Sequence, residues 1–411
     1  MIRFLLALLV LVTPVSFVSA DAPRQDRVVI LIGIDGFRPD YLDRGITPHL
    51  SALAGGGISG PMRPSFPTKT FSNHWTLVTG VVPDRHGIVG NRMEDPARPG
   101  ELFSMANEDP FWWNAAEPIW VMAERAGIRT ATMFWPGSNV GWGGTRARPN
   151  AMTEGGYRPA DWQAFNQAVS NTQRVNAVLD WLRRPPAIRP RLVTLYFDTV
   201  DTAGHEFGPD DPRTNAAIAE ADGHIGALLA GLKDLGITAD IVVVADHGMA
   251  AVASERTIAL DKLADPALYR VIESGPYAAL APTEGNADKL WAALAKPGPN
   301  HTCWRKEEIP AHLRYGRNPR VAPILCLARS GWSLVPTAPS RSFTGGAHGY
   351  DQTDPDMAAL FIANGPGFAG GVKLAAFDNT AITPLLRHFL GLPPLDSLDG
   401  TTKPFTRVLK P

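Results

Sequence analysis

Short apolar segments recur along the chain and alternate with amphipathic ones. Runs rich in β-branched and aromatic residues occupy positions 27–35, 129–135, 191–198 and 240–248. Their hydrophobicity is nearly continuous rather than alternating, which is typical of strands buried on both faces of a parallel sheet. Each of these segments therefore predicts a buried strand.

Between these strands, apolar residues recur every three to four positions at 117–127, 173–184 and 215–236. That period predicts amphipathic helices. Strands that alternate with helices predict an α/β fold with a mostly parallel central sheet and helices on both faces. The alternation is lost from 266 to 345, where the sequence is polar and irregular, and we interpret this segment as a smaller insertion or lid attached to the sheet.

The N-terminal residues differ in character from the rest of the chain. Arg3 precedes the apolar run FLLALLVLV, and small residues follow at Ser19 and Ala20. This order of regions predicts a secretory signal peptide over 1–20 and one exported domain over 21–411, located in the periplasm or secreted. A retained N-terminal anchor is the alternative. No later stretch approaches about 20 continuous apolar residues, so we expect no stable membrane anchor in the exported domain.

Charge and cysteine content narrow the class of partner and the compartment. Lysine and arginine (39) nearly balance aspartate and glutamate (40), which gives a net charge of -1. This balance does not favour binding to a nucleic-acid polymer. In an exported protein, Cys303 and Cys326 favour an intrachain disulfide, with two free buried thiols as the alternative.

Acidic residues follow three of the predicted strands. Asp35 ends the first strand, Asp198 and Asp201 follow the third, and Asp246 ends the fourth. Because ligands of open α/β sheets bind at the carboxyl ends of strands, we expect these carboxylates at one edge of the sheet. Each could instead be a helix cap, but that reading is less favoured for all the strand ends together.

Histidines accompany these acids. His205 lies four residues after Asp201, His247 directly follows Asp246, and His348 lies among glycines. Carboxylate oxygens with neutral imidazole nitrogens form a ligand set that suits Zn²⁺. An isolated histidine in such a loop is more often a hydrogen-bonding surface residue, and we place the remaining histidines in that class: 49, 74, 86, 224, 301, 312 and 388.

Five motifs in this order resemble the nucleotide pyrophosphatase/phosphodiesterase family of the alkaline phosphatase superfamily. They are IGIDGFRPDYL, PTKTFSNHWTLVTGVVPDRHGIVGN, DTAGHEFGP, ADHGM and GAHGYD. The resemblance spans the chain from Val28 onward. It implies an alkaline-phosphatase-like fold. It also implies an enzyme that hydrolyses nucleotide phosphodiester or pyrophosphate bonds to nucleoside 5′-monophosphates.

The resemblance also implies two Zn²⁺ per chain. One zinc site corresponds to Asp201, His205 and His348. The other corresponds to Asp35, Asp246 and His247, with the oxygen of Thr70 as a further ligand.

In the same family pattern, Thr70 is the nucleophile that forms a covalent threonine intermediate, and Thr68 supports it. Asn91 matches the residue that donates a hydrogen bond to the phosphoryl oxygen. Phe71 and Tyr196 match aromatic positions that stack on the base. Metal coordination is one of the few ways to ionise a threonine hydroxyl at neutral pH, which supports the nucleophile assignment. We expect Asp198 and Lys69 just outside the ligands, where ligand histidines need hydrogen-bond acceptors.

Several alternatives stay open. Three carboxylates and one alkoxide balance two divalent cations, which suits a diester monoanion better than a monoester dianion. A phospholipase-C-like choline phosphodiesterase and a phosphomonoesterase of the same superfamily share this metal site, and a non-catalytic binding protein is disfavoured because every ligand is present. Asn139 stands where relatives commonly have an acid.

Overall fold

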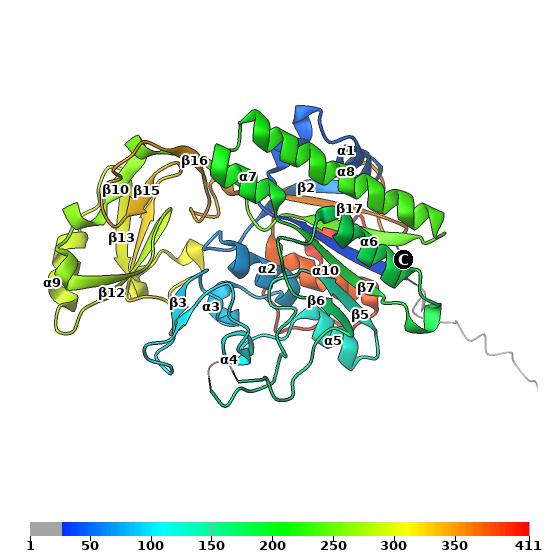
Figure 1. Ribbon diagram of the computed structural model, residues 1–411, viewed down its shortest axis with the longest axis horizontal. Coiled ribbons are helices and arrows are strands. Elements are labelled where there is room, and N and C mark those ends of the chain that lie inside the picture. The colour runs from blue at the N-terminus through cyan, green and yellow to red at the C-terminus, as the bar shows by residue number, and fades with distance from the viewer. Residues whose placement is uncertain (1–26, 149–150, 411) are drawn as a thin grey trace, which may run out of the picture.

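A computed structural model of the chain describes residues 27–148 and 151–410. The predicted signal peptide at 1–20 lies outside the described residues. Within them, a mostly parallel sheet of nine strands forms the centre, in the order β18-β2-β17-β8-β1-β7-β5-β6 with β19 also paired to β2 (Figure 1). Its strands are β1 (Val28–Ile34), β2 (Ile58–Arg63), β5 (Thr130–Met133), β6 (Asp161–Gln163), β7 (Leu192–Phe197), β8 (Ala239–Val244), β17 (Ala359–Asn364), β18 (Val372–Lys373) and β19 (Phe377–Asp378).

The three central strands are β7, β1 and β8, and every residue in them is buried. They run parallel, with Gly33 of β1 opposite Tyr196 of β7 and Val244 of β8. This register brings the carboxyl ends of the three strands to the same edge of the sheet. Strand β17 is antiparallel to both of its neighbours, β8 and β2, so the sheet is mixed on that side.

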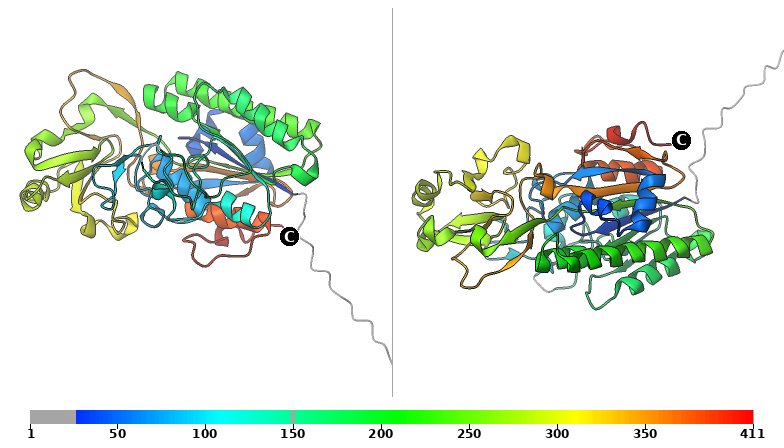
Figure 2. Two further views of the ribbon diagram at one scale, coloured as in Figure 1. Left: turned by 60° about the horizontal axis from the view of Figure 1, so that its bottom comes forward. Right: turned by 90° about the horizontal axis from the view of Figure 1, so that it is seen from above.

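Helices cover both faces of the sheet, as the sequence pattern predicts (Figure 2). Helices α1, α6 and α8 pack together over one face, while α2, α5 and α10 pack together over the other. The principal helices are α1 (Pro48–Gly56), α2 (Thr70–Thr79), α5 (Ile119–Arg125), α6 (Asn171–Leu182), α7 (Thr199–Phe207), α8 (Pro212–Asp234) and α10 (Ile382–Leu390).

Shorter elements complete this part of the chain. Two four-residue helices are α3 (Pro83–His86) and α4 (Pro110–Trp113), and a small ribbon pairs β3 (Met93–Glu94) with β4 (Leu102–Phe103). The 3-10 helices are η1 (Pro39–Arg44), η2 (Pro186–Ile188), η3 (Ser254–Arg256), η4 (Leu260–Lys262), η5 (Pro266–Leu268), η6 (Lys306–Glu308), η7 (Ala311–Leu313), η8 (Pro355–Met357), η9 (Asn379–Ala381) and η10 (Lys403–Phe405).

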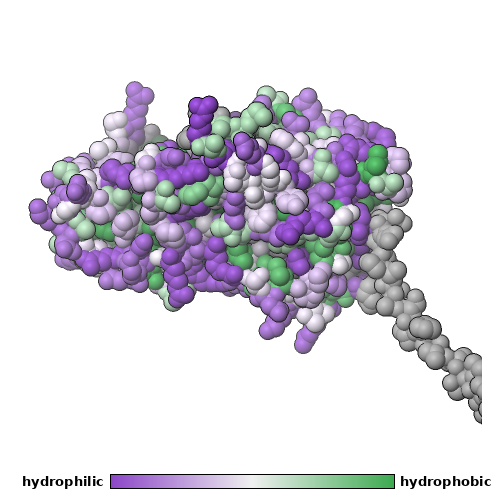
Figure 3. All heavy atoms as spheres, turned by 90° about the horizontal axis from the view of Figure 1, so that it is seen from below, coloured by the Kyte–Doolittle hydropathy of each residue, from purple (hydrophilic) through white to green (hydrophobic). Residues whose placement is uncertain are grey.

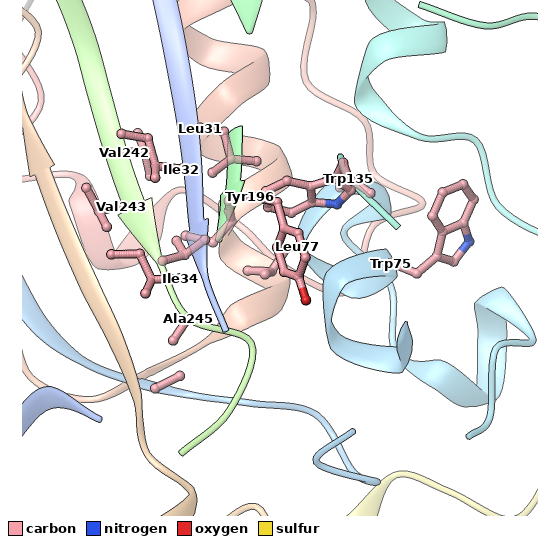
Figure 4. Packing of buried hydrophobic residues seen from close by; sticks show 14 of the residues in the cluster. Leu31, Ile32, Ile34, Trp75, Leu77, Trp135, Tyr196, Val242, Val243 and Ala245 are labelled. Carbon is pink, nitrogen blue, oxygen red and sulfur yellow. The ribbon is translucent and has the colours of Figure 1, made fainter. Parts of the chain in front are cut away.

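Aliphatic side chains of the central strands form the main core. Leu31 and Val242 extend from β1 and β8, and the rings of Trp135 and Tyr196 lie between these strands and α2 (Figure 4). Burying one such large apolar side chain stabilises the fold by about 1.5–3 kcal/mol. The core therefore fixes α2 against the sheet at the edge where the strands end.

The segment that we interpreted as an insertion is more regular than its polar sequence indicates. It contains a four-stranded antiparallel sheet in the order β11-β12-β14-β13 with its own buried cluster. The chain enters it through β9 and leaves through β16, which pair with each other. Its elements are β9 (Ala250–Ala253), β10 (Thr257–Ala259), β11 (Tyr269–Glu273), β12 (Tyr277–Pro282), α9 (Ala287–Leu294), β13 (His301–Arg305), β14 (Ile324–Ala328), β15 (Ser333–Val335) and β16 (Thr344–Ala347).

The predicted disulfide between Cys303 and Cys326 is present. The two cysteines lie opposite each other on β13 and β14, with their Cα atoms 3.9 Å apart. The bond is 4% or less exposed on both sides, within the small core of the insertion.

Within the described ranges, no helix combines the length and the apolar character that crossing a bilayer requires. The face shown in Figure 3 is mainly hydrophilic, with apolar residues scattered among the polar ones. Scattered apolar residues of this kind are normal on a protein surface.

The disulfide gives a stability prediction. Replacing both Cys303 and Cys326 by alanine should lower the stability of the insertion by about 3 kcal/mol, because a loop of this length is no longer closed in the unfolded chain. Urea unfolding, followed by circular dichroism, measures the change. The unmodified protein treated with a reductant is the control and should shift in the same direction. An unchanged transition in both would contradict the prediction.

Candidate active site

The first group of site residues comes from two neighbouring strands. Asp35 directly follows β1, and Asp246 and His247 follow β8. Each is at most 1% exposed. The Nε2 atom of His247 lies 3.4 Å from Asp35 Oδ1 and 2.9 Å from Asp246 Oδ2, so three possible ligand atoms converge on one point.

The second group combines α7 with the end of the insertion. Asp201 and His205 are one helical turn apart on α7, and His348 directly follows β16. The Nε2 atom of His205 lies 3.4 Å from Asp201 Oδ1 and 3.0 Å from His348 Nε2. The two groups adjoin, since the rings of His247 and His348 stack with centroids 3.4 Å apart. The structure thus brings all six predicted ligands together.

The three histidines are oriented in the same way. In each ring Nδ1 lies within hydrogen-bond distance of a backbone carbonyl: Gly346 for His205, Gly248 for His247 and Thr68 for His348. A carbonyl only accepts, so Nδ1 must donate. In the neutral ring, Nε2 then carries the lone pair that binds a metal. Backbone carbonyls are therefore the hydrogen-bond acceptors for the ligand histidines, where we expected Asp198.

The carboxylates of the site are crowded and buried. Burial raises the pKa of Asp35 well above its usual range, and the Asp246 and Asp201 carboxylates add to the effect. One oxygen of each of these three residues is buried without a hydrogen-bond partner. Such unpartnered oxygens are costly in a protein interior unless a cation or a proton compensates them.

When no metal is bound, bound protons and the neighbouring histidines compensate the negative charge of these carboxylates. Burial lowers the pKa of His247, but the Asp246 and Asp201 carboxylates and the Gly248 carbonyl together outweigh burial, and the net shift is upward. Burial also disfavours the charged form of Asp246, yet His247 and His74 hold the pKa of Asp246 well below its usual range. Burial and the neighbouring His247 lower the pKa of His348 well below its usual range. A bound divalent cation would displace the proton from His247.

Thr70 is the first residue of α2, and its Oγ1 lies 3.3 Å from His247 Nε2. The helix has no side-chain cap from Lys69 at the preceding position. At a helix N-terminus the backbone N–H groups lack intrahelical partners and attract negative charge. The Thr70 hydroxyl therefore lies where an anion is favoured and next to the candidate metal ligands.

Asn91 hydrogen-bonds to the N-terminal end of α2. Its Oδ1 accepts a hydrogen bond of 3.2 Å from the Phe71 N–H. Because a backbone N–H can only donate, this bond shows which atom of the Asn91 amide is the oxygen. The Nδ2 hydrogens are therefore free to donate to another acceptor. Both Asn91 and Phe71 line a cavity of about 590 Å³ that also reaches Asp35, Asp201 and His348.

The cavity wall is aromatic away from the candidate metal ligands. Tyr196 lines it but is only 6% exposed, and its hydroxyl donates a 2.5 Å hydrogen bond to Asp35 Oδ2. Phe165, which we did not predict, lines the same cavity and is 50% exposed. It follows the edge strand β6, in a loop where the sequence offers no signal beyond an exposed aromatic residue.

Several further residues have surroundings that the sequence did not indicate. His86 and His301, which we also placed among the surface residues, are buried at 0% and 8% exposed. His74, which we placed among the surface residues, is fully buried, and its Nδ1 lies 2.9 Å from the Thr70 carbonyl and 3.3 Å from Asp246 Oδ2. Asp198 pairs with the buried Arg174 at 2.7 Å. The Lys69 ammonium lies 3.9 Å from Glu273 Oε1 of the insertion, and its positive charge also helps to lower the pKa of His348. The spacing of four residues from Thr70 is the signal that could have placed His74 on this side of α2.

Comparison with known proteins identifies a family. Residues 29–351 match the model of the type I phosphodiesterase / nucleotide pyrophosphatase family. An uncharacterized pyrophosphatase/phosphodiesterase of Schizosaccharomyces pombe is 39% identical over 386 residues, 89% of this chain and 77% of the relative. A bovine bis(5′-adenosyl)-triphosphatase is 34% identical over 383 residues, 92% of this chain and 80% of the relative.

Solved structures of similar proteins have the same fold. Human ectonucleotide pyrophosphatase/phosphodiesterase 5 superposes with a TM-score of 0.87 at 33% identity, over 94% of this chain and 100% of the other. The murine counterpart, an inactive threonine-to-alanine variant in complex with AMP, gives 0.86 at 34% identity, over 93% of this chain and 100% of the other. The predicted alkaline-phosphatase-like fold is thereby confirmed. The chain therefore belongs to the type I phosphodiesterase / nucleotide pyrophosphatase family of enzymes.

Proposed function

We propose that the chain is a two-zinc enzyme that hydrolyses nucleotide phosphodiester or pyrophosphate bonds to nucleoside 5′-monophosphates. One observation carries this proposal. The Thr70 hydroxyl stands at the start of α2, 3.3 Å from His247, beside two adjoining triads of candidate metal ligands and on the wall of a cavity with aromatic sides. This arrangement supplies a nucleophile, a charge-compensating centre and room for a base.

The donor set fits zinc. Each triad offers carboxylate oxygen and imidazole nitrogen, the mixture that suits Zn²⁺ better than Mg²⁺ or Ca²⁺. Asp201, His205 and His348 would hold one ion, and Asp35, Asp246 and His247 the other. The unpartnered carboxylate oxygens of both triads support this assignment. When bound, two such ions stabilise the negative charge on the attacking and leaving oxygens.

The side chains of this protein then have defined tasks. The Thr70 oxygen attacks phosphorus, and its bond to phosphorus forms while the bond to the leaving oxygen breaks; the hydroxyl proton passes to solvent. Water later cleaves the threonine–phosphorus bond, which restores the Thr70 hydroxyl and releases the 5′-monophosphate. The free Asn91 amide and the backbone N–H at the helix start are placed to donate to the phosphoryl oxygen as charge develops on it.

The aromatic side chains of the cavity favour a nucleotide as substrate. Phe71 and the half-exposed Phe165 present ring surface to the cavity, and aromatic rings stack on bases of any type. Tyr196, which we assigned to base stacking from its sequence position, holds Asp35 through its hydroxyl and presents little surface. We therefore place the base between Phe71 and Phe165. The AMP complex of the murine relative and the bis(5′-adenosyl) triphosphate in the name of the bovine relative support this choice.

Export is part of the proposal. A buried disulfide is typical of an oxidising compartment. The relatives include ectonucleotide pyrophosphatases/phosphodiesterases. We infer that the enzyme acts outside the cytoplasm, in the periplasm or as a secreted protein.

Metal dependence is the first test. Dialysis against a chelator should abolish hydrolysis of bis(p-nitrophenyl) phosphate, and added Zn²⁺ should restore it, with two Zn²⁺ per chain by elemental analysis. Asp201→Asn should bind about one ion fewer, because a carboxylate ligand is lost. Asp210→Asn, an exposed neighbour, is the matched control and should keep both ions. Activity that survives the chelator would contradict the two-metal site.

The nucleophile is the second test. Thr70→Ala should lower kcat by at least about 10³-fold, because no oxygen remains to form the covalent intermediate. Thr70→Ser keeps an oxygen and should retain measurable activity. Mass spectrometry of the quenched reaction should find a nucleotide attached to Thr70 in the unmodified protein. Full activity of the alanine variant with bound metal would exclude this role.

The substrate is the third test. ATP should yield AMP and pyrophosphate, and Phe71→Ala and Phe165→Ala should each raise KM for a nucleotide substrate by roughly 10-fold, since base stacking is lost. Neither change should affect bis(p-nitrophenyl) phosphate to the same extent. Phe343→Ala, an exposed aromatic of the insertion outside the cavity, is the control. Phosphate release without AMP would favour a monoesterase, and preference for a choline phosphodiester lipid would favour the phospholipase-C-like alternative.

A further inference from the structure

The insertion reaches the active site along two routes. The first is its own connection to the sheet. Strand β9 begins three residues after His247, and β16 ends directly before His348. These two strands pair with each other, so the ribbon that carries the insertion is flanked by one ligand from each triad.

The second route is a pair of buried polar side chains. Glu273 ends β11 and Tyr277 begins β12, on either side of the tight connection between these strands. Glu273 is 8% exposed and Tyr277 is 1% exposed. The Tyr277 hydroxyl donates a 2.5 Å hydrogen bond to Glu273 Oε2. A hydrogen bond to a carboxylate at this distance is strong, so the pair forms a rigid unit of the insertion.

This unit contacts both segments that carry the proposed reacting groups. The second oxygen, Glu273 Oε1, lies 3.9 Å from the Lys69 ammonium, next to Thr70 in the chain. The first oxygen also accepts a 3.4 Å hydrogen bond from the N–H of Arg92, next to Asn91. One carboxylate of the insertion therefore touches the neighbour of the nucleophile and the neighbour of the phosphoryl donor.

Gly90 shows how closely the insertion packs against the segment that carries Asn91. A Cβ at Gly90 would lie 2.6 Å from Glu273 Oε2 and 2.9 Å from the Tyr277 hydroxyl. The backbone of Gly90 does not have a positive φ, so its conformation alone would accept alanine. The two closest contacts of such a Cβ are with the Glu273–Tyr277 pair, and the Arg92 carbonyl at 3.1 Å is the third.

We propose that Glu273 is a positioning residue of the insertion that fixes the Thr70 and Asn91 segments relative to each other. The carboxylate bonds to Tyr277 and Arg92 on one side and balances Lys69 on the other. The inference rests on the proposed function only in taking Thr70 and Asn91 as the reacting groups. In this proposal the insertion holds the Thr70 and Asn91 segments in position and does not act as a lid.

Two substitutions of Glu273 test the proposal on bis(p-nitrophenyl) phosphate. Glu273→Ala removes every contact and should lower kcat by about 50-fold with KM changed less than about 3-fold, because a misplacement near 1 Å costs about this much. Glu273→Gln keeps an oxygen that accepts from Tyr277 and Arg92. Its kcat should lie between those of the unmodified protein and Glu273→Ala, since the hydrogen bonds stay and the charge that balances Lys69 is lost. Glu273→Gln that is as impaired as Glu273→Ala would overturn the proposal.

Glu308→Gln is the matched control, because Glu308 is an exposed glutamate of the same insertion. Its kcat should equal that of the unmodified protein. Thermal unfolding and zinc content are measured for every variant. A Glu273→Ala protein with unchanged kcat would overturn the proposal, and so would a loss of kcat that is fully explained by lost zinc or by unfolding at the assay temperature.

Gly90→Ala perturbs the same contact from the opposite side. Alone, it should lower kcat by about 10-fold, because its Cβ displaces the Glu273 carboxylate. In a protein that already carries Glu273→Ala, the same change should cost clearly less than it costs alone, since the closest contact of the Cβ is gone and only those with Tyr277 and the Arg92 carbonyl remain. Additive losses would overturn the proposal.

The diester assay separates this inference from the proposed function. A protein that cleaves bis(p-nitrophenyl) phosphate but releases no AMP from nucleotides refutes the nucleotide substrate, and the Glu273 variants still decide the positioning role. A protein that cleaves neither substrate overturns both, since Thr70 and Asn91 are then not reacting groups.

Discussion

Mutual repulsion among three crowded carboxylates, two of them buried and that of Asp201 17% exposed, is the constraint on which this active site depends. Asp35, Asp246 and Asp201 lie together at one edge of the sheet, and each has an oxygen without a hydrogen-bond partner. A folded chain tolerates this arrangement only if positive charge is supplied from nearby. Histidines supply part of it when protonated, and metal ions bound by the candidate ligands would supply the rest. The main core holds the strand ends in place against this repulsion, so hydrophobic packing maintains a site that would otherwise spread apart.

Much of the fold and of the site was predictable because the decisive signals are local. The four predicted strands coincide with β1, β5, β7 and β8, since continuous β-branched runs are typical of doubly buried strands. The predicted ligands Asp35, Asp246 and His247 follow such strands closely, so a parallel sheet brings them to one edge. The structure brings the six ligands inferred from motifs together, although their roles in binding metal stay predictions.

The rest depends on contacts between residues far apart in the sequence. His74 was assigned to the surface because a lone histidine usually lies there, yet helix α2 turns it toward Asp246. Phe165 reaches the cavity from a loop that has no periodic pattern. The regular sheet of the insertion was hidden by its polar residues, and the role of Glu273 appears only when Lys69 and Arg92 are seen beside it. The antiparallel course of β17 likewise leaves no local trace in the sequence.

The β9–β16 ribbon has a consequence for how such proteins diversify. Because the two strands pair immediately beside His247 and His348, everything between them forms a closed loop whose ends stay fixed whatever lies inside. Changes in that loop that keep the Glu273–Tyr277 pair would leave both predicted ligands at the same spacing. An ancestral chain could therefore acquire new accessory domains at this point without rebuilding its metal centre. Engineered chimeras could use the same junction as a splice site.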